Sequence, residues 1–142
     1  MEAIIKDDII SHLWKHKLIS KHQHGFLTKH STFTQLLECV NDWSISLSNK
    51  KQVDVAYLDF AKAFDSIVHK KLLYKLKSYG INGLLLSWVE SFLSNRVQKV
   101  RVGSRLSDVI SVTSGVPQGS VLGPILFIIL TIYVIYLNDI RN

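Results

Sequence analysis

This 142-residue chain contains little cysteine and little proline: one cysteine, Cys39, and two prolines, Pro117 and Pro124. A single cysteine excludes an intramolecular disulfide and a zinc site built from several thiolates. The chain has no proline-rich linker, low-complexity tract or internal repeat, so we expect a globular fold, either one domain or a piece of a larger one. Cys39 lies among apolar residues and is expected to be buried.

Acidic residues are also scarce, with 11 Asp and Glu against 17 Lys and Arg and a net charge of +6. A basic domain favours an anionic partner, most commonly nucleic acid, and a basic but inert surface is the alternative. The N-terminus does not show a basic segment followed by an apolar one, so no signal peptide is expected. These features favour an intracellular location, in the nucleus or the cytoplasm.

Charge is absent from residues 121–137. A run of about 17 uncharged residues is at the lower limit for crossing a bilayer. Gly123 and Pro124 interrupt its start, and its β-branched and aromatic residues suit a buried helix or strand equally well. A small membrane-associated protein is therefore the less favoured alternative to a basic globular domain.

The spacing of apolar residues predicts a mixture of helices and strands. Ile5, Ile9 and Leu13 recur every four residues and predict a helix over residues 3–18. Ser31 or Thr32 is a suitable cap for a second helix through residue 47, whose apolar face comprises Phe33, Leu36, Leu37, Val40 and Leu47. Helices are also predicted at 66–79 and 84–93, a strand at 53–60, and a hairpin over 97–112 that turns near Gly103 and Ser104.

This order of elements has no strict βαβ alternation and predicts an α+β layout. In the helix at 66–79, Leu72, Leu73 and Leu76 are expected inside. The lysines of that helix are expected outside; they are Lys70, Lys71, Lys75 and Lys77.

Residues 57–65 read YLDFAKAFD and carry two carboxylates. The alternating apolar run of Val53, Val55 and Tyr57 ends at Asp59, and Asp65 follows six residues later. A strand that ends in an aspartate commonly places a metal ligand at the edge of a sheet. The same residues also suit an ordinary strand-to-helix junction with Asp65 as a helix N-cap. These nine residues alone leave both interpretations open.

A second motif, GVPQGSVLGP, occupies residues 115–124. Gly119 lets the backbone approach a ligand closely, and the Gln118 amide offers both a donor and an acceptor. Turns of this composition are common, so the loop alone is weak evidence. Its combination with Asp59, about 55 residues upstream, is more specific.

With these motifs the chain resembles the reverse transcriptases of non-LTR retrotransposons, of the LINE and jockey-like type. Residues 22–26 (HQHGF) with Ser31 and Thr32 resemble the fingers motif, residues 57–65 with His69 the first palm motif, and residues 115–124 the second. The connector is matched by Gly80, Ile81, Trp88, Phe92, Asn95 and Arg96.

The resemblance implies a single partial right-hand polymerase domain over residues 1–142, lacking the end of the palm and the thumb. About residues 1–52 would form a fingers-like helical part, and residues 53–142 the palm with connector helices and hairpin. The implied function is RNA-directed DNA polymerisation, with an RNA template, a DNA primer and dNTPs as partners and no membrane.

The resemblance also implies roles for individual residues. Asp59 would be the catalytic carboxylate that bridges two Mg²⁺ ions, with Mn²⁺ as an alternative, and the backbone carbonyl of Phe60 would complete part of one ion's shell. The nucleotide would bind against Phe64, whose ring would clash with a 2′-hydroxyl, and against Ala63, Gln118 and Gly119. The residues expected to contact template and primer phosphates are Lys62, Arg96, Lys99 and Arg101.

The chain departs from this family at three places. No aromatic-Ala-Asp-Asp element, the family's second metal-binding motif, occurs in it, and one carboxylate cannot hold two Mg²⁺ ions in near-octahedral geometry. Leu27 and His30 stand where the family usually has basic residues, and residues 130–135 look like an insertion. The 142-residue chain is therefore expected to be inactive alone, and a non-catalytic nucleic-acid-binding remnant is the alternative.

Overall fold

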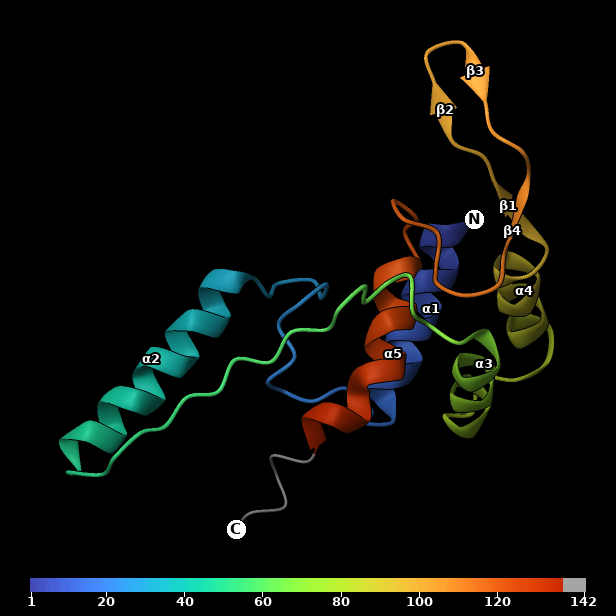
Figure 1. The fold of residues 1–142 in the computed structure, drawn as a ribbon. Helices are drawn as coiled ribbons and strands as arrows, with labels where there is room; N and C mark the ends of the chain where they lie inside the picture. Colours follow the sequence, from blue (N-terminus) through green and yellow to red (C-terminus); the bar gives the residue numbers. More distant parts are fainter. Residues whose placement is uncertain (137–142) are drawn as a thin grey trace. The chain divides into compact units, whose positions relative to one another are not determined.

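The computed structural model describes the backbone of residues 1–136 and the side chains of residues 1–131. Along this part of the chain the elements are α1 (Glu2–Lys15), α2 (Thr32–Ser48), α3 (His69–Ser78), α4 (Gly83–Leu93), β1 (Arg96–Gln98), β2 (Arg101–Val102), β3 (Arg105–Leu106), β4 (Ile110–Val112) and α5 (Gly123–Tyr136) (Figure 1). Helices and short antiparallel strands together make a mixed α+β domain, as predicted.

The chain divides into two compact units, which are described separately. The first, here called the helical unit, consists of Met1–Leu18 and Lys62–Asn142. The second, here called the α2 unit, consists of Ile19–Ala61.

The helical unit has a core of aliphatic side chains from all of its helices. α1 buries Ile5, Ile9 and Leu13, which confirms the prediction from their spacing. α3 packs against both α4 and α5. In the described part of this unit, the other buried aliphatic residues are Ile67, Leu72, Leu76, Ile81, Val89, Leu93, Val116, Leu122, Ile125, Leu126, Ile128 and Ile129. Removal of this apolar surface from water stabilises the unit.

α3 differs from its prediction at its start and on its outer face. The backbone N–H groups of Asp65 and Ser66 both donate to the Lys62 carbonyl, so this segment forms a turn and the helix begins only at His69. Lys75 was predicted on the outer face, but it is half-buried and donates from Nζ to the Leu130 carbonyl in α5 at 2.6 Å. Burial lowers the pKa of Lys75 because it disfavours the charged form.

The predicted hairpin is confirmed and consists of two antiparallel pairs in series. β1 pairs with β4, with Arg96 opposite Val112, and β2 pairs with β3, with Val102 opposite Arg105. The second register places the turn at residues 103–104, as predicted. Figure 1 shows the β2–β3 pair at the outer end of the hairpin, which leaves α4 and extends away from the helices of its unit.

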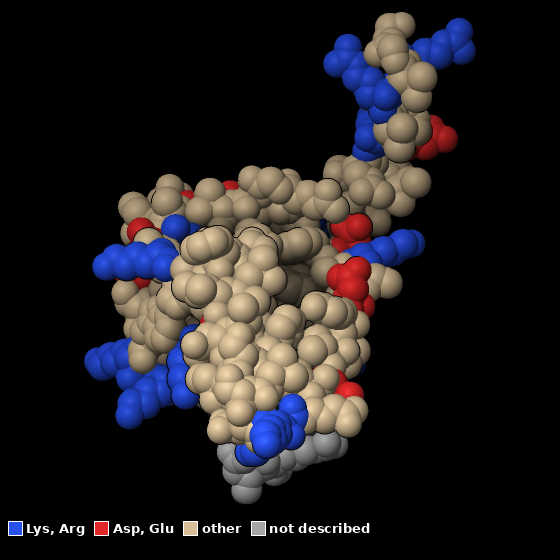
Figure 2. All heavy atoms as spheres, turned by 90° about the vertical axis from the view of Figure 1, so that its left-hand side faces the viewer, with Lys and Arg blue, Asp and Glu red and all other residues tan. Residues whose placement is uncertain are grey.

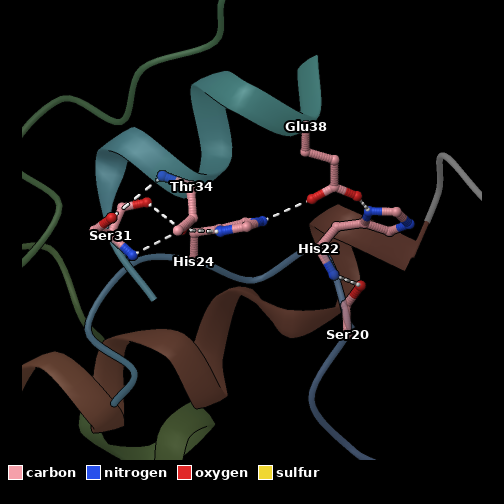
Figure 3. A network of polar contacts seen from close by, with 6 residues as sticks. All are labelled: Ser20, His22, His24, Ser31, Thr34 and Glu38. Atoms are coloured by element: carbon pink, nitrogen blue, oxygen red, sulfur yellow. Dashed lines mark hydrogen bonds and ion pairs between the residues drawn. The ribbon is translucent and has the colours of Figure 1, made fainter. Parts of the chain in front are cut away.

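α2 begins with a capping box. The Ser31 hydroxyl accepts a hydrogen bond from the Thr34 backbone, and the Thr34 hydroxyl accepts one from the Ser31 backbone. One turn further along α2, the Glu38 carboxylate reaches the preceding loop, where its oxygens lie 2.7 Å from Nε2 of His24 and 2.5 Å from Nδ1 of His22 (Figure 3). The other ring nitrogen of His24 lies 2.8 Å from the Thr34 hydroxyl. These contacts attach the loop to the helix.

The α2 unit is held by this polar network more than by an apolar core. Hydrogen bonds from His24 and then His22 lower the pKa of Glu38, because they favour its ionised form. His24 is almost fully buried, and Ile19 and Leu27 are the apolar side chains buried in this unit.

The apolar face predicted for α2 is correct as a pattern, but it does not reach a core. α2 has no buried residue, and the side chains of Phe33, Leu36, Leu37, Val40 and Leu47 are exposed. Cys39 is half-buried, not buried as predicted. The sequence therefore predicted that α2 forms and which of its faces is apolar. It did not indicate what this apolar face contacts.

The strand predicted at residues 53–60 is not formed. This segment has no regular secondary structure, and Val55, Tyr57 and Leu58 are exposed. A strand needs a neighbouring backbone to receive its hydrogen bonds. In the described part of the chain, the strands pair only within the hairpin, so the alternating segment has no partner.

α5 contains most of the uncharged run at residues 121–137, whose last residue lies outside the described residues. Among the helices of residues 1–136, none is both long enough and apolar enough to cross a bilayer.

Candidate nucleotide site

The loop that precedes α5 is bound to the segment that precedes α3. The backbone N–H of Gly115 donates to the Ile67 carbonyl at 2.8 Å, and that of Val116 donates to the Phe64 carbonyl at 2.9 Å. The Ser114 hydroxyl donates to the Asp65 carbonyl at 2.9 Å. These hydrogen bonds join two segments that are about 50 residues apart in the sequence.

Gly115 allows this close approach. Its φ of +77° lies in the left-handed region, which favours glycine. A Cβ added to Gly115 would lie 2.8 Å from both the Asp65 Cα and the Phe64 carbonyl oxygen. Any other residue would therefore force the two segments apart.

Three further side chains hold the loop from the outside. His69, in the first turn of α3, places Nε2 2.8 Å from the Gly115 carbonyl, and Arg96 donates from Nη2 to the Ser114 carbonyl at 3.2 Å. Burial lowers the pKa of Arg96 because it disfavours the charged form. The Glu2 carboxylate accepts from the backbone N–H of Val121 at 2.8 Å, close to the positive end of the α5 dipole.

Among the described residues, cavities of two sizes border the loop. The smaller, of about 360 Å³, is lined by Phe64, Pro117, Gln118, Gly119, Ser120, Gly123 and Pro124. The larger, of about 860 Å³, lies between the loop and the base of the hairpin, and both Asp65 and Gln118 border it. Cavities of this size suit a small ligand.

The smaller cavity brings together three residues predicted to bind nucleotide: Phe64, Gln118 and Gly119. The Phe64 ring is set against the Phe127 ring of α5, with centroids 5.1 Å apart. Ala63 is half-buried beside Phe64 in the chain. The cavity therefore has an aromatic wall fixed by packing and a polar wall provided by the loop.

A comparison with known proteins identifies the family. The model of the family described as reverse transcriptase (RNA-dependent DNA polymerase) matches residues 1–139. The chain belongs to the reverse transcriptase family. No solved structure matches it.

Relatives of this reverse transcriptase chain are polymerases of non-LTR retrotransposons. The chain is 37% identical over 139 residues to the RNA-directed DNA polymerase from mobile element jockey of Drosophila melanogaster, covering 98% of this chain and 14% of the relative. It is 33% identical over 126 residues to the probable RNA-directed DNA polymerase from transposon X-element of the same species; the match covers 89% of this chain and 14% of the relative. The reverse transcriptase chain thus spans about one seventh of the length of these relatives.

The aspartate predicted to be catalytic and the loop predicted to bind nucleotide lie in different units. Asp59 and Phe60 are exposed residues of the irregular segment in the α2 unit, whereas Gln118 and Gly119 belong to the helical unit. Lys62 is exposed in the turn that opens the second segment of the helical unit, with a φ of +51°.

The described residues do not fit the family's pair of metal ions. Within that part of the chain, no group of three or more His, Cys, Asp or Glu side chains is arranged to hold a metal ion. Two Mg²⁺ ions need several oxygen ligands at about 2.1 Å. Asp59 alone does not meet that requirement.

Three of the four predicted phosphate-binding residues belong to the hairpin, and they differ in their contacts. Lys99 and Arg101 are exposed on the hairpin, and Figure 2 shows basic side chains gathered on its projecting end. Arg96 instead donates to loop carbonyls at the base of the hairpin. Arg105, which follows the turn, is also exposed and was not among the predicted residues; its place in a basic hairpin is the sequence signal that would have included it.

Asp65 has a different contact from the predicted one. The N-cap of α3 is Val68, so the interpretation of Asp65 as the cap of this helix is wrong. Its carboxylate instead accepts a hydrogen bond from Nε2 of Gln118 at 3.1 Å. No local sequence signal indicated this contact, because the two residues are 53 positions apart.

Proposed function

We propose that this chain forms part of the polymerising region of an RNA-directed DNA polymerase, and that the smaller cavity receives the sugar of an incoming dNTP. The observation that supports this most directly is the meeting of Phe64, Gln118 and Gly119 in one cavity. The names of the relatives support the reaction class. In the whole protein, an RNA template and a DNA primer would be the other partners.

The proposed role of Phe64 is to exclude ribonucleotides. Its ring packs against Phe127 and therefore has little freedom to move aside. A sugar bound against the ring would have no space for a 2′-hydroxyl. Ala63 would border the same position from the adjacent residue.

The proposed chemistry is nucleotidyl transfer, in which the primer 3′-hydroxyl attacks the nucleotide and pyrophosphate leaves. In the whole protein, bound divalent ions would supply activation of the hydroxyl and stabilisation of the leaving group. Asp59 is proposed as one carboxylate ligand, with the Phe60 carbonyl beside it. Since further acidic ligands are required, we expect the 142-residue chain alone not to extend a primer.

A second candidate function is nucleic-acid binding without catalysis. It is favoured by the exposed basic side chains of the hairpin, Lys99, Arg101 and Arg105. Binding of this kind would be independent of nucleic-acid sequence and would weaken as the salt concentration rises.

The experiment that separates these functions uses a chimera. The matching segment of the Drosophila melanogaster jockey polymerase is replaced by this chain, and primer extension is measured on an RNA template with Mg²⁺. We expect extension that Asp59→Ala abolishes. We also expect Phe64→Ala to raise the use of ribonucleotides relative to dNTPs by at least about tenfold, because it removes a steric barrier in a pocket.

Phe92→Ala is the matched control, since it removes the same ring from α4, where Phe92 stacks on Trp88. It should not change the choice of sugar. An inactive chimera that still binds nucleic acid in a salt-sensitive way would favour the second function. If the isolated chain extends a primer and Asp59→Ala abolishes this activity, the prediction that the isolated chain is inactive is wrong.

A further inference from the structure

The side chains of Asp65 and Gln118 connect the two segments that border the cavities. Nε2 of Gln118 donates to Oδ1 of Asp65 at 3.1 Å. Gln118 borders both cavities, and Asp65 borders the larger one. Asp65 also directly follows Phe64, so adjacent residues provide the aromatic wall and the partner of the Gln118 amide.

The chemistry of this contact fixes the direction of the amide. An ionised carboxylate can only accept hydrogen bonds, so the Gln118 group that faces Asp65 must be the NH₂. The amide oxygen, Oε1, then remains as the acceptor of this side chain. Within the described part of the chain, Oε1 makes no hydrogen bond to protein.

The backbone contacts between the two segments do not require the Asp65 carboxylate. Ser114 donates to the Asp65 main-chain carbonyl, and the N–H of Val116 donates to that of Phe64. Removal of the side chain should therefore leave the loop attached. The carboxylate has a separate role, which concerns the Gln118 amide.

We propose that Asp65 is a positioning residue, whose carboxylate holds the Gln118 amide so that Oε1 accepts a hydrogen bond from a donor group of the bound nucleotide. This inference rests on the proposed function for the identity of the ligand. The orientation of Gln118 by Asp65 is a property of the chain alone and can be tested without any nucleotide.

The first test follows the Gln118 side-chain amide by ¹H–¹⁵N NMR in the 142-residue chain, with its resonances assigned from their loss in Gln118→Ala. In Asp65→Ala we expect these resonances to move towards those of Gln98, an exposed glutamine of β1. Asp65→Asn, which keeps an acceptor oxygen, should restore part of the difference. The backbone resonance of Gly115 should change little, because its hydrogen bond to Ile67 is retained.

Asp108→Asn is the matched control, because it removes one negative charge from an exposed position of the hairpin. It should leave the Gln118 amide resonances in place. If Asp65→Ala also leaves them in place, Asp65 does not orient Gln118 and the proposal is wrong.

The second test measures steady-state kinetics in the jockey chimera. Loss of an oriented acceptor should raise the KM for dNTP by roughly tenfold in Asp65→Ala, with a smaller change in kcat and partial rescue by Asp65→Asn. An unchanged KM would contradict the role of Asp65 in ligand binding. An inactive wild-type chimera would argue against the proposed function, whereas the NMR result would still decide whether Asp65 orients Gln118.

Discussion

The helical unit buries aliphatic side chains from all of its helices, whereas the α2 unit leaves the apolar side of its helix exposed and connects that helix to a loop through polar groups. Ile9, Leu76 and Leu126 are fully buried in the first unit, but Phe33 and Leu37 are largely exposed in the second. In the sequence, helices of both units show the periodic spacing of apolar residues that is typical of an amphipathic helix. Amphipathic spacing therefore predicts where a helix forms and which side is apolar, but the surface it meets depends on the rest of the fold.

This contrast predicts different responses to change. The stability of the helical unit should depend mainly on volume and close packing, because its contacts are apolar. The stability of the α2 unit should depend more on the ionisation of a few side chains. The following substitutions test the contrast, from the largest expected effect to the smallest.

Truncation of a core leucine should have the largest effect. Leu76→Ala in α3 should lower the free energy of unfolding by about 3 kcal/mol, because it leaves a cavity where α3 meets its neighbouring helices. Leu37→Ala is the matched control on the exposed face of α2 and should change it by less than about 0.5 kcal/mol. Urea unfolding followed by circular dichroism measures both, and equal losses would show that the face of α2 is buried in solution.

Substitution of Gly115 should have the next largest effect. Gly115→Ala combines a positive φ with a Cβ only 2.8 Å from the Asp65 Cα, so we expect a loss of about 2 to 3 kcal/mol. Gly103→Ala has a similar φ of +60° at the hairpin turn, where an added Cβ meets nothing within 4 Å. It should cost about 1 kcal/mol. Equal losses in thermal unfolding would mean that the loop does not approach Asp65 so closely.

The smallest effect should come from Glu38 and should depend on pH. Because hydrogen bonds lower the folded-state pKa of Glu38 below 4.5, its contribution is fully present above pH 4.5 and is lost as the pH falls through the lowered pKa. Glu38→Gln should therefore lower the free energy of unfolding at neutral pH. In the variant, this free energy should fall less between neutral and acidic pH than in the wild type. Glu90→Gln, which removes an exposed carboxylate from α4, controls for the loss of one charge. Equal pH profiles for the two variants, from thermal unfolding between pH 3 and 7, would contradict this role of the network.

Local features of the fold were predictable from the sequence. Ser31 was one of the two residues predicted to cap α2, and it is the cap; a capping box needs only residues three positions apart. The hairpin turn at Gly103 and the buried stripe of α1 were predictable for the same reason. The strand at residues 53–60 was wrongly predicted, because alternation shows that a segment suits a sheet but not that a partner strand lies beside it.

For the candidate site, too, the residue types were predictable from the sequence, but the long-range contacts were not. The motifs indicated the family, and they predicted that Phe64, Gln118 and Gly119 bind nucleotide; the fold brings these three residues to one cavity. They did not predict that Asp65 pairs with Gln118, and the helix cap that they suggested for Asp65 is not formed. That contact joins residues 53 positions apart, and only the packing of the loop on the segment before α3 brings the residues together.

By itself, the sequence determined the family, the helices with local caps or periodic apolar residues, and the residue types of the site. The tertiary structure decided which groups come into contact: Gln118 with the carboxylate of Asp65, His69 with the backbone carbonyl of Gly115, and Glu38 with two histidines. The physical reason is the separation along the chain over which each interaction acts. Caps and helical periods act within a few residues, whereas these contacts form only when distant segments of the chain pack together.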